Sequence, residues 1–376
     1  MQVALYLKHF PAGAPLRDGP SIAVAGLASG LAQNGVRATV LCEGPARRSL
    51  RGERYDVECF EQPAPRCRFT LAPGLKRYVA ERLASMRELF VLNGMFHPSV
   101  YAFGRWLRRL GAPYVVAPHG SYDKGVFRHN PHLKWPYWYL FERHLLERAC
   151  AIQVLDARHA ALLRALGIDT RVIATENGVT PESVPPESKL NWRCEGGPAR
   201  LVYLGRIDAH YKGLDILVDA LARAGKQRPC ELALRGPDWG DQARLEKRAR
   251  RAGIAGKVRF IGPVLDRTSP EIIADYDIFC LPSRFEAFGL SALEAMLAAR
   301  VLLVSERAGI ARHVEASGCG VTVAPTVDGV LTGLDQLLAC RERWREMGMS
   351  GRRHALAHLN WGSIAGAALR EYRRLI

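Results

Sequence analysis

The stretch Ile278-Phe-Cys-Leu-Pro-Ser-Arg-Phe-Glu-Ala-Phe-Gly-Leu-Ser-Ala-Leu-Glu294 decides the fold, because it predicts a strand followed directly by a helix. The apolar run 278–281 predicts a buried strand that ends at Pro282. Gly289 predicts a turn, and the Ala- and Leu-rich run from Ser291 predicts a helix. A strand that passes through a short loop into a helix is part of a βαβ unit, which indicates a parallel sheet.

Two carboxylates flank the start of this helix, Glu286 in the loop before it and Glu294 in its expected first turn. A helix N-terminus presents free N–H groups and positive potential, which suit a phosphate, so the pair could hold a phosphorylated sugar. A simpler interpretation is also open. Ser291 and Glu294 have the spacing of a capping box, in which Glu294 only satisfies the N–H of Ser291, and Glu286 is then an ordinary loop residue.

Length and composition predict a globular protein of two domains, because 376 residues exceed one ordinary core. Hydrophobic residues make up 48% of the chain, yet no apolar run approaches the ~20 residues of a membrane span. The first residues predict a strand and lack the flanks of a signal peptide. The nine cysteines are scattered, without zinc spacing, which favours reduced thiols in a cytoplasmic protein.

The net charge of +16 is uneven, since residues 1–180 carry 24 Lys and Arg against 14 Asp and Glu. A basic face could meet an anionic membrane or acidic ligands, although an Arg-rich composition alone could also inflate the charge. We expect no nucleic-acid partner, because no RNA-binding, zinc-finger or helix-turn-helix signature is present. The run 75–92 has helical apolar spacing with interspersed cations, which predicts either a membrane-resting helix or a solvated surface helix.

The first half begins with a βαβ pattern. Residues 2–7 predict a strand, a loop containing Gly19 follows, and residues 21–34 predict a helix with Ser21 as its N-cap. The strand 114–117 ends at Pro118-His119-Gly120, which would place His119 at a ligand-binding edge or, as is usual for a lone histidine, in the core. A long helix is expected over 134–148.

Residues 180–198 are rich in Pro and Gly and predict a linker. We therefore place an N-terminal domain at 1–180, joined by the C-terminal helix 361–376, and a C-terminal domain at 199–360. In the second domain, the strand 200–204 is followed by Gly205-Arg206 and then Lys212-Gly213. Two cations at the carboxyl end of a sheet can clamp a diphosphate.

The order strand–Gly-Arg–Lys-Gly, strand–Gly, then strand–Pro-Ser-x-x-Glu-x-Phe-Gly-x-x-x-x-Glu resembles retaining glycosyltransferases of the GT-B fold, sequence family four. The resemblance is strongest over 201–323, and His119-Gly120, Asn177-Gly178 and the last helix after Trp361 fit it too. It implies an α/β fold of two Rossmann-like βαβ domains facing each other across a cleft, with the C-terminal helix crossing back to the first domain.

The resemblance also implies roles for single residues. Arg206 and Lys212 would hold the donor diphosphate and stabilise it as it leaves. Glu286 would position the hydroxyls of the donor sugar, and His119 would lie beside the sugar ring; these four form the implied catalytic group. The remaining implied donor-binding residues are Gly19 at the phosphates, Glu294 at the ribose, Gly236 and Gly262 around the base, and the backbone of Phe288, Gly289 and Leu290 at the sugar.

The implied activity is transfer of a sugar, with retention and without a metal or cofactor, from a nucleotide-diphosphate sugar to a polysaccharide or lipid-linked glycan. A UDP-sugar is favoured over a GDP-sugar, and the inner face of an anionic membrane is a candidate surface for peripheral attachment. Pro20 departs from the family pattern, because it removes an N–H beside Gly19. The alternatives are a nucleotide-sugar 2-epimerase of the same fold and a non-catalytic basic binding module.

Overall fold

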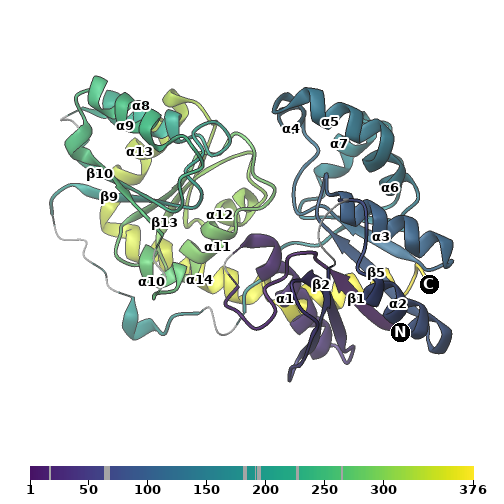
Figure 1. Cartoon of the computed structure of the whole chain (residues 1–376). Coiled ribbons are helices and arrows are strands. Elements are labelled where there is room, and N and C mark those ends of the chain that lie inside the picture. The colour runs from purple at the N-terminus through teal and green to yellow at the C-terminus, as the bar shows by residue number, and fades with distance from the viewer. Residues whose placement is uncertain are drawn as a thin grey trace. The chain divides into compact units, whose positions relative to one another are not determined.

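A computed structural model describes residues 1–16, 18–62, 68–180, 184–190, 192, 196–225, 228–263 and 266–376. The chain divides into two compact units (Figure 1). Unit 1 comprises residues 1–178 together with 361–376, and unit 2 comprises residues 179–360. Parts of the expected linker, at 181–183, 191 and 193–195, lie outside the described residues.

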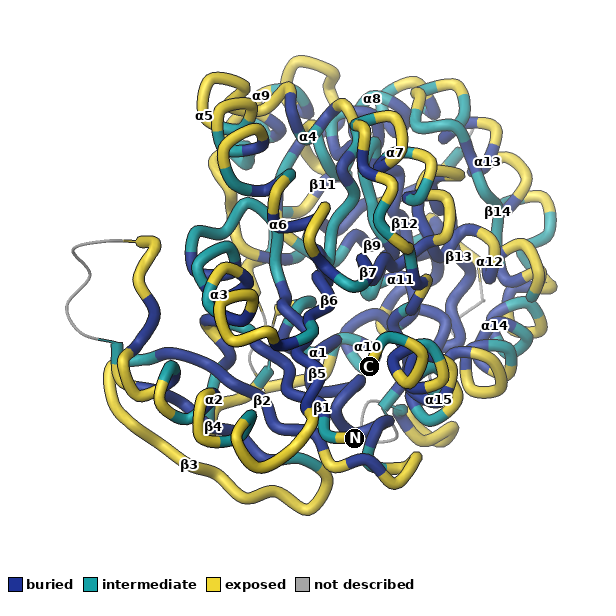
Figure 2. The backbone as a smooth tube through the Cα atoms, turned by 90° about the vertical axis from the view of Figure 1, so that its right-hand side faces the viewer, coloured by how far each residue is buried: buried dark blue, intermediate teal, exposed yellow. Residues whose placement is uncertain are grey.

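Unit 1 contains a sheet with the strand order β3-β4-β2-β1-β5-β6-β7-β8. Neighbouring strands are parallel except for the edge pair β3 and β4. The edge strand β3 is exposed along its length, whereas β1 at the centre is largely buried (Figure 2). The strands are β1 (Gln2–Tyr6), β2 (Ala38–Gly44), β3 (Arg48–Arg51), β4 (Tyr55–Glu61), β5 (Glu88–Asn93), β6 (Tyr114–Ala117), β7 (Ala151–Val154) and β8 (Val172–Ala174).

Helices cover both faces of this sheet, as the alternation along β1 requires. Val3 and Leu5 belong to one apolar core, and Ala4 and Tyr6 belong to the other. The helices of unit 1 are α1 (Gly19–Gln33), α2 (Pro73–Ser85), α3 (Pro98–Arg109), α4 (Lys124–Arg128), α5 (Pro131–Tyr137), the π-helix η1 (Trp138–Glu142), α6 (Arg143–Glu147), α7 (His159–Ala165) and α15 (Trp361–Tyr372).

The C-terminal helix α15 packs against α1, so the end of the chain returns to the first unit. This contact depends on small residues in α1. A Cβ at Gly26 would lie 2.1 Å from the Trp361 ring, and one at Gly30 would lie 2.2 Å from the Trp361 carbonyl. The expected return of the last helix is therefore present.

Three local expectations for unit 1 are wrong. The helix expected over 75–92 ends at Ser85, and residues 88–93 form the buried strand β5 beside β1. The N-cap of α1 is Asp18, whose carboxylate accepts from Ser21 N at 2.9 Å, so Ser21 lies inside the helix.

The single helix expected over 134–148 is instead α5, η1 and α6 in succession. Pro136 lies inside α5, where it cannot donate a backbone hydrogen bond. The π-turn that follows holds Glu142, which is buried and accepts from Tyr122 Oη at 2.6 Å and from Phe96 N at 3.0 Å. The irregular π-turn of this helix therefore coincides with a buried polar cluster.

Unit 2 contains a parallel sheet with the order β11-β10-β9-β12-β13-β14. Its strands are β9 (Ala199–Leu204), β10 (Cys230–Arg235), β11 (Val258–Ile261), β12 (Ile278–Leu281), β13 (Val301–Ser305) and β14 (Gly320–Val323). The α-helices are α8 (Leu214–Ala224), α9 (Gln242–Arg251), α10 (Ser269–Ile273), α11 (Leu290–Leu297), α12 (Ala311–Ser317), α13 (Val327–Ala339) and α14 (Trp344–His358). The short 3-10 helices are η3 (Glu187–Lys189), η4 (Ala255–Lys257) and η5 (Arg341–Arg343).

The strand order of unit 2 reverses between β9 and β12. The chain runs outward from β9 through β10 to β11 and then returns to β12 on the other side. Loops that leave such neighbouring strands at their carboxyl ends form the usual ligand-binding crevice of open α/β sheets. The two loops at this point are 205–213 and 282–289.

Candidate active site

The loops after β9 and β12 are locked together. Gly213 has a φ of +67°, and a Cβ there would lie 2.1 Å from the Pro282 carbonyl oxygen. The Arg284 guanidinium donates to both carboxylate oxygens of Asp215, at 2.7 and 2.9 Å. A bidentate pair of this kind fixes orientation as well as distance, so the two loops hold their side chains in a defined arrangement.

Lys212 and Glu286 meet directly at this junction. The Lys212 Nζ donates to the Glu286 Oε2 at 2.7 Å, and the two side chains are 16% and 15% exposed. The hydroxyl of buried Ser283 lies 3.5 Å from the same carboxylate oxygen. The structure therefore brings together the expected diphosphate cation and the expected sugar ligand.

Arg206 lies nearby on the β9 loop and is exposed. Its guanidinium stacks over the ring of Trp239, 4.2 Å from the centroid, and its carbonyl accepts from Tyr203 Oη at 2.8 Å. Burial raises the pKa of Tyr203 well above its usual value; the Glu286 carboxylate adds to that rise, and the Arg206 cation opposes it. Both charges thus act on the Tyr203 hydroxyl.

The helix α11 begins at Leu290 without a capping side chain. Its N-cap is Gly289, whose φ of +108° suits glycine and whose Cβ position would lie 3.0 Å from Leu281. Ser291 therefore lies inside the helix, and the capping box with Glu294, the alternative interpretation of this stretch, is absent from this helix. Phe288, directly before the cap, is buried and anchors the turn. The uncapped N–H groups and the positive helix end can accept an anion.

Glu294 lies in the second turn of α11, one turn later than expected. Burial raises its pKa to about 7, and a hydrogen bond from the Ser269 side chain opposes the rise. Ser269 is the first residue of α10, so the carboxyl group faces that neighbouring helix. A carboxyl group with one hydroxyl partner retains capacity to accept further hydrogen bonds.

The two glycines expected around a base differ in their surroundings. A Cβ at Gly236 would lie 2.0 Å from the Gly205 carbonyl oxygen, so this glycine permits the β9 and β10 loops to approach. Gly262 is exposed at the end of β11, and a Cβ there would have no neighbour within 4 Å among the described residues. Gly236 thus has a structural task in the protein itself.

In unit 1, Gly19 is the first residue of α1 and Pro20 is the second. The carboxylate of Asp18 already occupies the N–H of Ser21. Since Pro20 has no N–H, the start of α1 offers an incoming anion few donors.

His119 follows β6 with a φ of +56° and is partly buried. One imidazole nitrogen, Nε2, lies 2.7 Å from Asn93 Oδ1. Asn93 is itself buried at the end of β5, where its amide donates to the carbonyls of Tyr6 and Val91. Burial lowers the pKa of His119 to about 4, with the Asp18 charge opposing the shift, so the ring is neutral near pH 7. Asn93 therefore requires a proton on Nε2 and leaves Nδ1 as an acceptor.

Several of these residues were missed from sequence: Tyr203, Asn93, Ser283, Ser269 and the pair Arg284–Asp215. Asn93, Ser269 and the pair Arg284–Asp215 act through partners far away in the chain, so no local motif identifies them. Tyr203 and Ser283 have partners three residues away, but neither belongs to a motif that the sequence singles out. Asn93 alone carries a signal, as a polar residue at the end of an apolar strand. Within the described ranges, no group of His, Cys, Asp or Glu is arranged to hold a metal ion.

Family models match both halves of the chain. Residues 186–354 match glycosyl transferases group 1, and residues 18–178 match the glycosyl transferase 4-like domain. The fold and these matches define a glycosyltransferase of the GT-B class. The chain belongs to sequence family four of these nucleotide-sugar glycosyltransferases, which confirms the resemblance seen in its motifs.

Curated relatives include an MMP α-(1→4)-mannosyltransferase from Mycolicibacterium hassiacum, 28% identical over 64% of this chain and 58% of that protein. A D-inositol 3-phosphate glycosyltransferase from Catenulispora acidiphila is 31% identical over 59% of this chain and 55% of its own length. The match therefore spans less than three fifths of each of these relatives.

Solved structures share the fold along the whole chain. A sucrose-phosphate synthase from Thermosynechococcus elongatus has a TM-score of 0.78 at 20% identity, with 100% of this chain and 99% of that chain covered. Anabaena HepE, solved in complex with UDP and glucose, has a TM-score of 0.73 at 16% identity, with 99% of each chain covered. At these identities the likeness concerns the fold.

Proposed function

We propose that this protein transfers a sugar, with retention of configuration, from a nucleotide-diphosphate sugar to a polysaccharide or lipid-linked acceptor. The observation that carries the proposal is the Lys212–Glu286 contact of 2.7 Å beside the uncapped start of α11, at the switch point of a parallel sheet. The Lys212 cation and the positive end of α11 suit the negative charges of a diphosphate. The Glu286 carboxylate can accept hydrogen bonds from the hydroxyls of the sugar ring joined to it.

The proposed reaction needs no protein nucleophile. The bond between the anomeric carbon and the diphosphate oxygen breaks, and the acceptor oxygen bonds to the same face of that carbon. The acceptor proton passes to the departing phosphate oxygen. Lys212 and Arg206 stabilise the charge that develops on the diphosphate, and such preorganised charges lower the barrier most where charge develops. Glu286 positions the sugar hydroxyls.

The other site residues keep the roles that the family resemblance implies. Glu294 accepts from the ribose hydroxyls, and the backbone of Phe288, Gly289 and Leu290 donates to the sugar. In this proposal Gly236 and Gly262 border the base and Gly19 approaches the phosphates. Neutral His119 lies beside the sugar ring. UDP-sugars are proposed as donors, which agrees with the UDP in the HepE complex. The names of the mannosyltransferase relatives make GDP-mannose the second donor to test.

Metal independence, a cytoplasmic location and peripheral attachment to an anionic membrane remain parts of this proposal. The described cysteines are all free thiols, which fits a reducing compartment. No helix in the described part of the chain has the length and apolar character needed to cross a membrane.

The test is a transfer assay with UDP-glucose, UDP-N-acetylglucosamine and GDP-mannose, against phosphatidylinositol and D-inositol 3-phosphate as acceptors. We expect one donor to give a product with the same anomeric configuration as the donor, measured from the one-bond C1–H1 coupling in the NMR spectrum, and we expect the rate to persist in EDTA. An inverted product would contradict retention, and loss of activity in EDTA would contradict metal independence. Isomerisation of the donor sugar without acceptor would favour the epimerase alternative.

A further inference from the structure

A basic groove lies on unit 1 between α2, α3 and the π-helix η1. It consists of two cavities of about 290 and 240 Å³ that share Tyr101, Arg105 and Arg109 as lining residues. Lys76 of α2 lines the larger cavity, and Arg108 lines the smaller one. Among the described residues that line the two cavities none is acidic, so this part of the groove presents Lys76, Arg105, Arg108 and Arg109 without a counter-charge.

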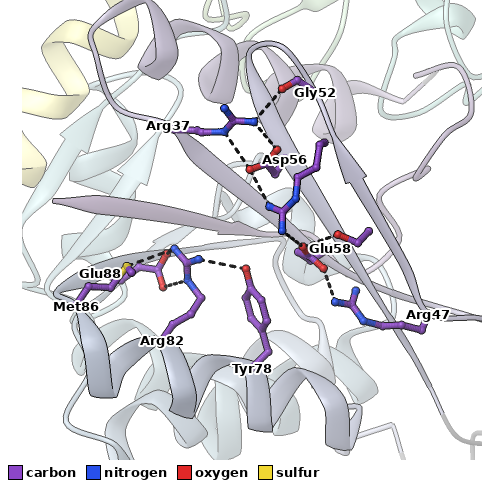
Figure 3. A network of polar contacts seen from close by, with 11 residues as sticks. Arg37, Arg47, Gly52, Asp56, Glu58, Tyr78, Arg82, Met86 and Glu88 are labelled. Carbon is purple, nitrogen blue, oxygen red and sulfur yellow. Dashed lines mark hydrogen bonds and ion pairs between the residues drawn. The ribbon is translucent and has the colours of Figure 1, made fainter.

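Several other arginines of the same unit have carboxylate partners. Arg37 pairs with Asp56, and Arg82 pairs with Glu88 at 2.7 Å, as the network in Figure 3 shows. Across the described ranges, Arg105, Arg108 and Arg109 have no ion pair, and all three are exposed. Three neighbouring arginines on the last turns of one helix repel one another, so an anion bound between them lowers the energy of the arrangement.

The walls of the groove are aromatic. Tyr101 and Phe141 have ring centroids 5.1 Å apart, and Phe69 lies 4.7 Å from Phe141. The Lys76 ammonium lies over the Trp106 ring at 5.5 Å. The Trp106 indole N–H is shielded from solvent and has no hydrogen-bond acceptor in the described chain. A buried donor without a partner is costly, which indicates a missing acceptor beside these cations.

The helical segment 131–142, whose Phe141 lines the groove, carries an exposed apolar set of side chains, here called the rim: Leu133, Trp135, Tyr139 and Leu140. Tyr139 and Leu140, next to Phe141, are 57% and 60% exposed, and Leu133 is 62% exposed. Trp135 stacks with Tyr139 at 5.9 Å. Amphipathic aromatics and leucines beside arginines are the residue set that anchors proteins in the headgroup layer of a bilayer.

We propose that this groove binds an anionic phospholipid, with its phosphate held by Arg105 and Arg109 and its glycerol and upper acyl carbons against the apolar rim. The exposed rim favours a lipid over a free phosphate, because a water-soluble anion would leave Tyr139 and Leu140 in water. This inference deepens the membrane attachment in the proposed function by naming the surface and the ligand, and it does not involve the site of transfer.

The test is co-sedimentation with phosphatidylcholine vesicles, with and without phosphatidylglycerol. We expect wild type to bind only the anionic vesicles and R105Q/R109Q to lose at least tenfold in affinity. The matched control R164Q/R370Q removes two exposed arginines elsewhere in unit 1 and should bind like wild type. Equal losses in both double variants would show attachment by diffuse charge, which overturns the groove and leaves membrane attachment standing. If the wild-type protein does not bind anionic vesicles, both the groove proposal and the proposed membrane attachment are overturned.

Two further experiments test whether the bound phosphate belongs to a lipid and whether the rim contributes to binding. Dihexanoyl-phosphatidylglycerol below its micelle concentration should change tryptophan fluorescence in wild type and not in R105Q/R109Q, whereas inorganic phosphate should change neither. An equal response to inorganic phosphate would make this a phosphate site and overturn the lipid assignment. L140S should also weaken binding to anionic vesicles at least tenfold, while L356S, which changes an exposed leucine of unit 2, should not. Unimpaired binding by L140S would contradict the rim.

Discussion

The Nζ of Lys212 donates to the Oε2 of Glu286 at 2.7 Å. The side chain proposed to hold the donor diphosphate is thus paired, in this structure, with the side chain proposed to hold the donor sugar. Both are mostly shielded from water, where a charge-assisted bond is strong and an unpaired charge is costly. The pair keeps both groups in place, and an incoming diphosphate must compete with Glu286 for Lys212.

Glu286→Gln separates the two roles. Without the carboxylate, Lys212 loses the anion that competes with the ligand, so UDP should bind at least as tightly as to wild type. Turnover of the sugar donor should fall about 100-fold, because the sugar loses its positioning ligand. Calorimetry with UDP and initial rates measure the two effects, with exposed Glu231→Gln as the control. UDP binding that weakens along with turnover would assign Glu286 to the nucleotide.

Glu294→Gln should stabilise the protein at high pH. The folded-state pKa of Glu294 is about 7, above its usual value of 4.5, so the folded chain binds a proton that the unfolded chain releases between these pH values. Ionised Glu294 therefore costs stability above pH 7, and the cost fades as the pH falls toward 4.5.

We expect the variant to melt about 2 °C or more higher than wild type at pH 8 and at the same temperature at pH 4.5. Its donor KM should rise, because the ribose loses an anionic acceptor. A variant that is less stable at pH 8, or that keeps its donor KM, would contradict this account.

Gly236→Ala and Gly262→Ala should behave differently. The methyl group that Gly236→Ala introduces would collide with the Gly205 carbonyl oxygen at 2.0 Å, in a backbone of φ +140°. Because both the contact and the backbone conformation oppose a side chain there, this variant should melt at a clearly lower temperature than wild type.

Gly262→Ala has open space and should melt like wild type. A higher donor KM in Gly262→Ala, at unchanged stability, would therefore report contact with the donor itself. Equal melting temperatures for the two variants would contradict the close approach of the β9 and β10 loops.

Asn93→Ala should impair catalysis through His119. The amide oxygen fixes the proton on His119 Nε2, so its loss frees the ring to rotate and change tautomer. We expect kcat to fall about tenfold. In a double-mutant cycle, His119→Ala should cost less in the Asn93→Ala background than in wild type. Additive losses would mean that Asn93 only supports the strand end.

Sequence reasoning found the sheet of unit 2 and its two key loops because strands, glycines and charges follow one another there within short stretches. Lys212 and Glu286 are 74 residues apart, yet each has a local motif. The helix expected over 75–92 is present up to Ser85 and wrong only in its last part. The apolar spacing of that part suits a helix, but burial of Leu89 and Val91 beside β1 favours a strand. The capping box considered for Ser291 and Glu294 is absent because Gly289 is the N-cap, so the helix already begins at Leu290.

The most direct test of the central claim is the affinity of Lys212→Ala for the nucleoside diphosphate, measured by calorimetry with UDP and GDP. Lys247→Ala is the matched control, since Lys247 is an exposed lysine of α9 in the same unit. The account predicts that wild type and Lys247→Ala bind the same nucleotide with the same Kd, and that Lys212→Ala binds it at least tenfold more weakly. Equal affinity in all three proteins would contradict a diphosphate site at Lys212.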